Sequence, residues 1–132
     1  MSRRQNYSIP GIRHVANPIP MAARVGNAFQ SSAIPGRDPA TNRVPEDAAK
    51  EIEFAFANAR ALLDAADVEA DQVVYVEVLL ADNALRGDVN KHWLDWFPND
   101  DDRPARHTTI RDLPNGMKIQ LVVRAQLETT NG

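Results

Sequence analysis

The sequence predicts a single α+β domain in which two helices cover one face of a mixed β-sheet. Its periodic segments follow the order strand, strand, helix, strand, helix, strand, strand, with no internal repeat. No linker long enough to divide domains interrupts the 132 residues. We therefore expect one domain over residues 1–132, in which residues 1–17 form an N-terminal tail and an edge strand.

The N-terminal third predicts a β-hairpin followed by a loop. Residues 22–25 and 28–34 are short strand candidates on either side of Gly26-Asn27. Asn and Gly tolerate the positive φ that a tight hairpin turn requires. Residues 35–42 contain Pro, Gly, Asp and Asn, which all favour turns, so we expect a loop there.

The middle of the chain predicts an amphipathic helix and then a buried strand. The helix is expected over residues 45–66, with Pro45 at its first position and acidic residues beside the positive end of its dipole. Residues 73–80 are rich in β-branched side chains and apolar on both faces, which predicts a central strand covered on both sides. The apolar face of the helix comprises Ile52, Ala55, Phe56, Ala59, Leu62, Leu63 and Ala66.

A second helix is expected to begin at Asp82 or Asn83 and to end before Pro98. Residues 105–112 and 117–127 then predict two strands, joined by a turn at residues 113–116. Alternation along the last strand leaves one face apolar and the other mostly polar. The face of the sheet opposite the helices would be uncovered in a monomer, and copies of the chain packed as a closed ring would cover it.

Composition excludes several classes of protein. The formal net charge of −3 argues against a protein that binds phosphate backbones, so no nucleic-acid partner is expected. Cysteine is absent, which removes disulfides and thiolate sites. There is no secretory signal and no apolar run near the roughly 18 residues that span a bilayer. We expect a cytoplasmic protein with no membrane partner.

From about Pro18 to Leu127 the chain resembles the RidA/YjgF family. Each matching motif is short, and their order and spacing together carry the resemblance. They are Gly26-Asn27, Ser31-Ser32, Asp38-Pro-x-Thr-Asn42, Ala65-Ala66, Val89-Asn90 with Trp93 and Phe97, Pro104-Ala-Arg106 and Leu113-Pro-x-Gly116.

This resemblance implies a chorismate-mutase-like fold, a homotrimer, and hydrolysis of reactive imines or enamines to ketones and ammonia without a cofactor. It also implies that Arg106 holds the carboxylate of a small metabolite, since a planar guanidinium can bind two carboxylate oxygens at once. The alternative from the residues alone is a surface arginine that pairs with the acidic run Asp100 to Asp102.

Several positions depart from the family pattern. Gln120 stands where active deaminases place a Glu, and an amide cannot accept a proton as a carboxylate can. Ile19 replaces a Tyr, Ala33-Ile34 replaces Gly-Gln, and Thr108 replaces a small residue. The implied catalytic residues are Arg106 and Gln120, and the implied substrate-binding residues are Arg106, Ser32, Ala33, Ile19, Thr108, Asn90 and Trp93.

Other polar and aromatic residues have simpler interpretations. Strand alternation places His107 on the face opposite Arg106, and neither His14 nor His92 has a partner at metal-ligand spacing, so we expect no metal. Trp93 should be buried, whereas Trp96 could reach a neighbouring subunit. Ser31 and Ser32 are binding candidates, because no His and Asp are placed to activate either one.

Three functions remain open on the sequence. The first is a deaminase-like hydrolase, in which Arg106 holds the carboxylate and Gln120 orients water. The second is a binding protein that uses the same pocket without chemistry. RNA cleavage is the least favoured, because the chain has a negative net charge and no basic aromatic surface.

Overall fold

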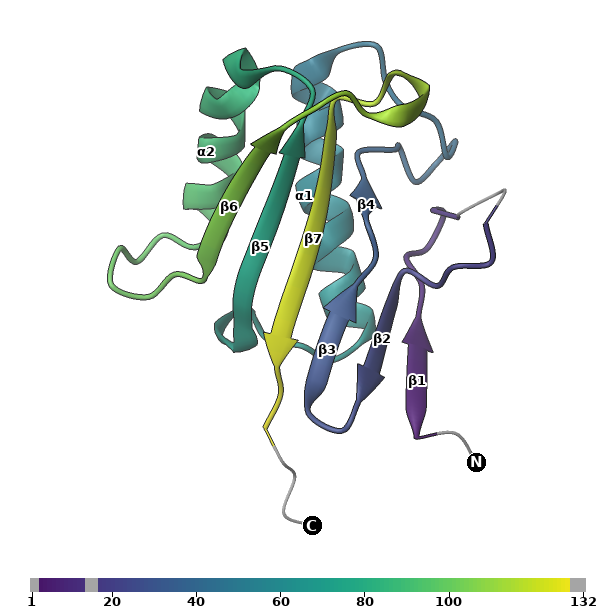
Figure 1. Cartoon of the computed structure of the whole chain (residues 1–132), viewed down its shortest axis with the longest axis vertical. Helices are drawn as coiled ribbons and strands as arrows, with labels where there is room; N and C mark the ends of the chain where they lie inside the picture. Colours follow the sequence, from purple (N-terminus) through teal and green to yellow (C-terminus); the bar gives the residue numbers. More distant parts are fainter. Residues whose placement is uncertain (1–2, 14–16, 129–132) are drawn as a thin grey trace.

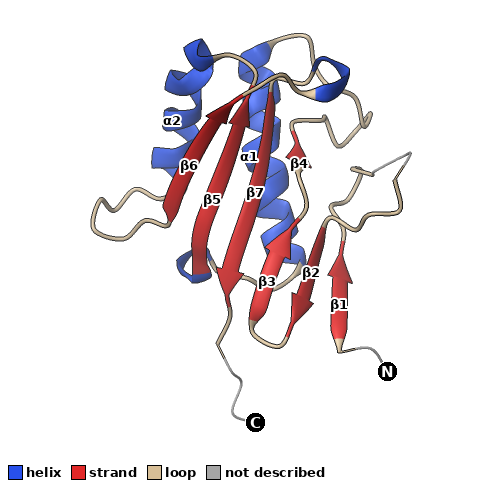
Figure 2. Cartoon of the chain, in the orientation of Figure 1, coloured by secondary structure: helices blue, strands red, loops and turns tan. Residues whose placement is uncertain are grey.

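The computed structural model describes residues 3–13 and 17–128, which form one β-sheet with a layer of helices on one side (Figures 1 and 2). In chain order, the elements are β1 (Arg4–Tyr7), β2 (Ala22–Val25), β3 (Ala28–Ser31), β4 (Ile34–Pro35), α1 (Ala48–Ala65), β5 (Val73–Leu80), α2 (Arg86–Trp96), β6 (Ala105–Ile110) and β7 (Ile119–Gln126). The mixed sheet and the two helices confirm the predicted α+β class.

The strands lie in the order β1, β2, β3, β7, β5, β6, and β4 also pairs with β7. Strands β5 and β6 are parallel, and the other pairs are antiparallel. The turn at residues 113–116 carries the chain past β5 rather than closing a hairpin, because β5 lies between β6 and β7. Strands β1 and β6 therefore form the two edges of the sheet.

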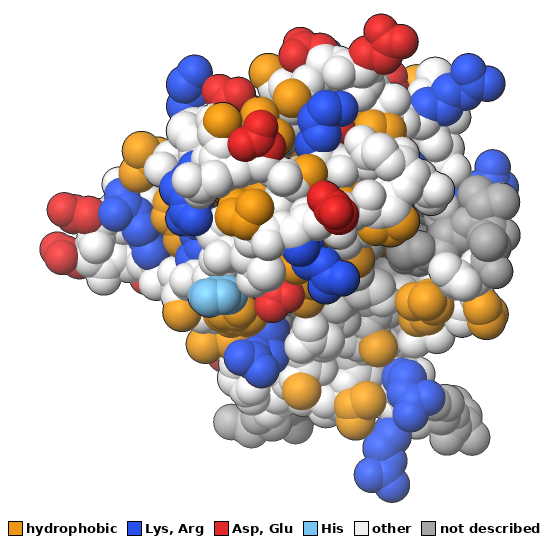
Figure 3. All heavy atoms as spheres, turned by 45° about the horizontal axis from the view of Figure 1, so that its top comes forward, with side chains coloured by type: hydrophobic (Ala, Val, Ile, Leu, Met, Phe, Trp, Pro, Cys, Tyr) orange, Lys and Arg blue, Asp and Glu red, His pale blue; other side chains and the backbone are white. Residues whose placement is uncertain are grey.

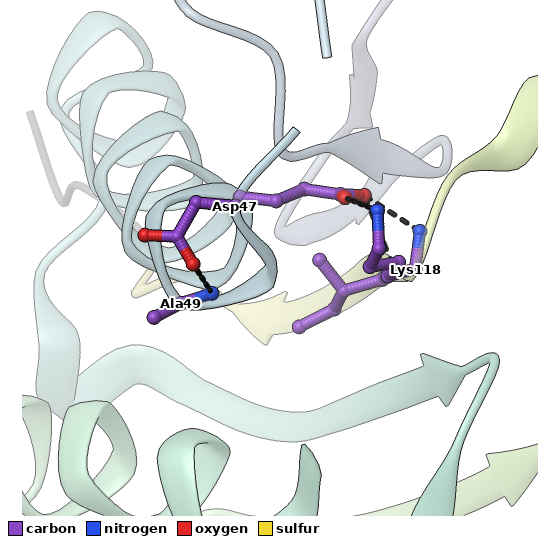
Figure 4. Close-up of polar contacts among 5 residues, drawn as sticks. Asp47, Ala49 and Lys118 are labelled. Carbon is purple, nitrogen blue, oxygen red and sulfur yellow. Dashed lines mark hydrogen bonds and ion pairs between the residues drawn. The ribbon is translucent and has the colours of Figure 1, made fainter. Parts of the chain in front are cut away.

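Helix α1 begins at Ala48, three residues after the predicted start at Pro45. The reason is local, since the carboxylate of Asp47 accepts a 3.1 Å hydrogen bond from the backbone N–H of Ala49 and so caps the helix (Figure 4). The seven apolar residues predicted for the inner face are all buried. Their burial against the sheet forms the centre of the core.

Helix α2 also begins later than predicted, because Asp82 caps a 3₁₀ turn at Asn83–Leu85 before the α-helix starts at Arg86. Trp93 is buried, as expected. The expectation that Trp96 reaches a neighbouring subunit is wrong for this fold. The residue is 7% exposed and its ring stacks on Phe97 at 4.6 Å between centroids, so it belongs to the core of the chain itself.

In the described part of the chain, helices cover only one face of the sheet. Along β7, Ile119, Leu121 and Val123 are fully buried beneath the helices, whereas the side chains between them face the other way. Strand β5 was predicted to be covered on both sides, and in the single chain Tyr75, Glu77 and Leu79 remain partly exposed. Within the described residues, neither helix has the length and apolar character of a bilayer span.

Candidate functional site

Arg106 lies on the edge strand β6 with its side chain directed toward α2. Its Nη1 donates a 2.8 Å hydrogen bond to Oδ1 of Asn90, and its Nε donates a 3.3 Å hydrogen bond to Oγ1 of Thr108. The guanidinium carbon lies 5.2 Å from the centre of the Trp93 ring, within the range of a cation–π contact. Three residues expected at the ligand site thus surround Arg106.

The charge on Arg106 has no acidic partner in the described part of the chain. Partial burial lowers the pKa of Arg106, and the positive charge of Arg86 lowers it further. An arginine remains protonated at any working pH. Two cations therefore lie close together with no carboxylate at ion-pair distance from Arg106. This arrangement favours an anionic ligand.

The alternative role for Arg106, a surface pair with the acidic loop, is not realised. Asp100, Asp101 and Asp102 are exposed and make no ion pair with Arg106. The arginine that holds this loop is Arg103, whose Nε donates a 2.8 Å hydrogen bond to the carbonyl oxygen of Phe97. Arg106 is therefore left free of the loop.

A cavity of about 310 Å³ contains the other predicted site residues. Apolar side chains and neutral polar side chains both line it, and Arg37 adds a positive charge. The lining residues are Asn17, Ile19, Ser32, Ala33, Pro35, Arg37, Pro114, Asn115, Met117 and Gln120. Ile19, Ser32, Ala33 and Gln120 are thus brought together as the sequence implied.

The two neighbouring serines have different surroundings. Ser31 is buried, and its Oγ accepts a 2.8 Å hydrogen bond from the backbone N–H of Val123, so the expectation that it binds a ligand is wrong. Ser32 lines the cavity, and its hydroxyl donates a 2.7 Å hydrogen bond to the carbonyl oxygen of Pro20. Only the lone pairs of that hydroxyl remain for a ligand.

Two buried polar residues of α1, which sequence reasoning missed, hold the walls of this cavity. Asn58 donates hydrogen bonds of 3.0 and 2.9 Å to the carbonyl oxygens of Pro35 and Arg37. Glu51 accepts hydrogen bonds of 2.7 and 3.3 Å from the backbone N–H groups of Lys118 and Ile119. Figure 4 shows Lys118 meeting this carboxylate beside α1.

A signal for these two residues was present in the helical pattern. Glu51 and Asn58 occupy the same inward-facing stripe as Ala55 and Leu62, at spacings of three and four residues. A polar side chain on a buried stripe requires a hydrogen-bond partner. Their partners are backbone groups of distant loops, which local periodicity does not identify.

The Arg106 group and the cavity lie on opposite faces of the sheet. Arg106 pairs in register with Val76, which is fully buried on the helix-covered face. Gln120 pairs with Leu79 and points to the open face, between the buried Ile119 and Leu121. Strand β5 also lies between β6 and β7, which puts those two strands about 10 Å apart, and the register offsets the two residues by three positions along β5. One chain alone therefore does not bring them to one small ligand.

The two histidines of the described residues, His92 and His107, take no part in either group. His92 stacks on Phe56 at 5.4 Å between ring centroids, and His107 lies on the face opposite Arg106, as strand alternation predicted. His14 lies outside the described residues. Within residues 3–13 and 17–128, no three acidic or histidine side chains come together as metal ligands.

Comparisons with known proteins agree with this fold. The sequence model of a family described as endoribonuclease L-PSP matches residues 14–127. No curated protein sequence matches the chain significantly.

Solved structures resemble the chain over almost its whole length. A protein from Thermotoga maritima is 25% identical with a TM-score of 0.84, over 97% of this chain and 99% of that one. The YjgF gene product from E. coli is 22% identical with a TM-score of 0.80, over 92% and 98%. RidA from an Antarctic Psychrobacter is 23% identical with a TM-score of 0.82, over 93% and 99%.

Proposed function

The chain belongs to the endoribonuclease L-PSP family, which includes RidA and YjgF, and from this premise we propose that it is a RidA-like hydrolase. Its substrate would be an imine, an enamine or an amino-unsaturated acid whose carboxylate binds Arg106. The observation that carries the proposal is the half-buried Arg106 guanidinium, held by Asn90 and Trp93 without an acidic partner in the described chain. A carboxylate matches its planar donors.

The proposed site forms between two copies of the chain. Arg106 and the cavity that contains Gln120 occupy opposite faces, so a complete site requires Arg106 from one copy and the cavity from another. A homotrimer would repeat this contact three times in a closed ring. The open face of the sheet carries the partly exposed apolar side chains Leu79 and Val122, which such packing would cover.

The proposed reaction requires little from the protein beyond positioning. Water adds to the carbon of the C=N bond, the resulting carbinolamine loses its amino group as ammonia, and a ketone remains. An enamine first tautomerises to the imine, gaining a proton on carbon and losing one from nitrogen. Gln120 would orient the water through its side-chain amide. Orientation alone supplies much of the acceleration when the substrate is already reactive.

A binding protein without catalysis is the second candidate. None of the described side chains that line the cavity can exchange a proton near neutral pH, because Gln120 is an amide and Arg37 is a guanidinium. General acid–base catalysis contributes about a hundredfold or more where such a group is present. The absence of one from this lining favours recognition of a carboxylate metabolite over rapid turnover.

RNA cleavage, the activity named in the family description, has little physical support in this chain. The net charge is −3, and Figure 3 shows acidic and basic side chains interspersed over the face that it presents. Affinity for a phosphate backbone depends on clustered Lys and Arg. A nuclease activity of this chain would also have to weaken steeply with salt.

The test of the proposed function is ammonia release from freshly generated 2-aminoacrylate and from longer amino-unsaturated acids. Wild type, Arg106→Ala and the control Arg111→Ala are compared, because Arg111 is an exposed arginine just beyond β6. Release above the uncatalysed rate that disappears only in Arg106→Ala supports the hydrolase. Carboxylate binding without release in the wild type supports the binding protein.

A further inference from the structure

We propose that Arg37 binds a second acidic group of the ligand, so that this site recognises a dicarboxylate. The inference rests on the proposed function for the role of Arg106 and names the substrate class of the same site. Arg37 is the one charged residue among the described residues that line the cavity. It lies in the segment after β4 and shares the cavity with Gln120, whose side chain faces away from Arg106 of the same chain.

The Arg37 guanidinium keeps one edge free for a ligand. Its Nη1 donates a 3.0 Å hydrogen bond to the carbonyl oxygen of Arg13, and no carboxylate of the described residues lies at ion-pair distance. The adjacent Nε and Nη2 donors point along the other edge of the planar group. That edge matches the two oxygens of a carboxylate.

The backbone that carries Arg37 is held firmly in place. Asn58 donates hydrogen bonds to the carbonyl oxygens of Pro35 and of Arg37 itself. Gly36 between them packs so closely on α1 that a Cβ atom there would lie 2.1 Å from the carbonyl oxygen of Glu51. A charged group supported in this way is preorganised for binding, unlike an arginine on a mobile surface loop.

The rest of the cavity suits a short carbon chain with an acidic end. Its volume of about 310 Å³ is at the small end of the range for metabolite pockets. Ile19, Pro35 and Met117 provide apolar walls beside Arg37. With Arg106 of a second copy holding one carboxylate, these walls would contact methylene groups and Arg37 would hold the other carboxylate.

Calorimetric titration of the full-length protein with two matched ligands tests this inference. 2-Oxoglutarate and 2-oxopentanoate have the same five-carbon length and differ in one terminal carboxylate. We expect the wild type to bind 2-oxoglutarate about tenfold or more tightly, from one additional charge-assisted contact. Arg37→Gln should lose that preference, Arg37→Lys should keep part of it, and Arg43→Gln, from the same loop, should keep all of it.

The outcomes separate this inference from the proposed function. The role of Arg37 would be overturned if the wild type bound both ligands with equal affinity. It would also be overturned if Arg37→Gln lost affinity for both ligands equally. Arg106→Ala should weaken the binding of both ligands to the same extent, because both contain the carboxylate beside the 2-oxo group. If Arg106→Ala changed neither affinity while Arg37→Gln still removed the preference, the proposed role of Arg106 would fail and Arg37 would remain an acid-binding residue.

Discussion

Arg106 and Asn90 face each other across the boundary between the edge strand β6 and helix α2, joined by a hydrogen bond of 2.8 Å. This contact connects the two elements at the place where Arg106 carries a positive charge with no acidic partner among the described residues. Because Trp93 lies one turn further along α2 and supports the same guanidinium, the helix fixes the direction in which Arg106 can meet a ligand.

Asn90→Ala should weaken binding of 2-oxoglutarate and 2-oxopentanoate by about tenfold, because Arg106 loses the partner that orders it. Calorimetric titration measures the affinities. Lys91→Ala is the matched control, since its exposed side chain on the same helix forms an ion pair with Asp88 instead. An affinity unchanged in Asn90→Ala would contradict this positioning role.

Glu51→Ala should lower the free energy of unfolding by about 3 kcal/mol, because the change leaves buried backbone N–H groups and Lys118 without their acceptor. Glu51→Gln, which keeps an acceptor of similar shape, should cost about 1 kcal/mol. Urea denaturation of both variants gives the comparison. If both variants lost the same free energy of unfolding, Glu51 would not stabilise the protein through its hydrogen bonds at the start of β7.

The neighbouring serines provide a matched pair of substitutions. Ser31→Ala should destabilise the protein by about 1 to 2 kcal/mol, because the buried N–H of Val123 loses the hydroxyl oxygen that accepts its hydrogen bond, and ligand affinity should change little. Ser32→Ala should have the opposite profile, with a small effect on stability and weaker ligand binding. Denaturation measures the stability of each variant, and titration measures its ligand affinity. A loss of affinity in Ser31→Ala with a loss of stability in Ser32→Ala would contradict these two roles.

Gln120→Glu should raise the rate of ammonia release by about tenfold or more, because a carboxylate in the cavity can accept a proton from water. Initial rates on 2-aminoacrylate measure the effect. Gln126→Glu is a suitable control, because it adds the same charge to β7 outside the cavity. A rate in Gln120→Glu no higher than in wild type would count against the proposed placement of water.

Much of the fold could be predicted from local sequence patterns. Strand β5 was predicted with the bounds that it has in the structure, because eight consecutive residues favour strand and turn signals flank them. The apolar residues of the inner face of α1 were predicted from its 3.6-residue period, whereas the buried Glu51 and Asn58 on the same face were not. The first turn of the helix was not predicted either, because Asp47 and not Pro45 makes the capping contact.

The candidate site was only partly predictable. Alternation correctly placed Arg106 and Thr108 on one side of β6 and His107 on the other. The separation of Arg106 from Gln120 depends on β5 lying between β6 and β7, which local patterns do not encode. Trp96 was misplaced for a similar reason, because its burial depends on Phe56 of another helix.

The central claim is that Arg106 of one copy completes the cavity of another, and mixed trimers test it most directly. Arg106→Ala lacks the anchor, and Ala33→Trp fills the cavity, so each homotrimer should fail to bind 2-oxoglutarate. Light scattering first establishes whether the purified protein is a trimer.

Trimers that contain both variants are purified through two different tags and titrated with 2-oxoglutarate. In any closed ring with both kinds of subunit, one of the three contacts joins an intact Arg106 to an open cavity, so we predict binding at about one third of the wild-type stoichiometry. Mixed trimers that bind no ligand, or a wild-type protein that binds ligand as a monomer, would contradict a site shared between copies.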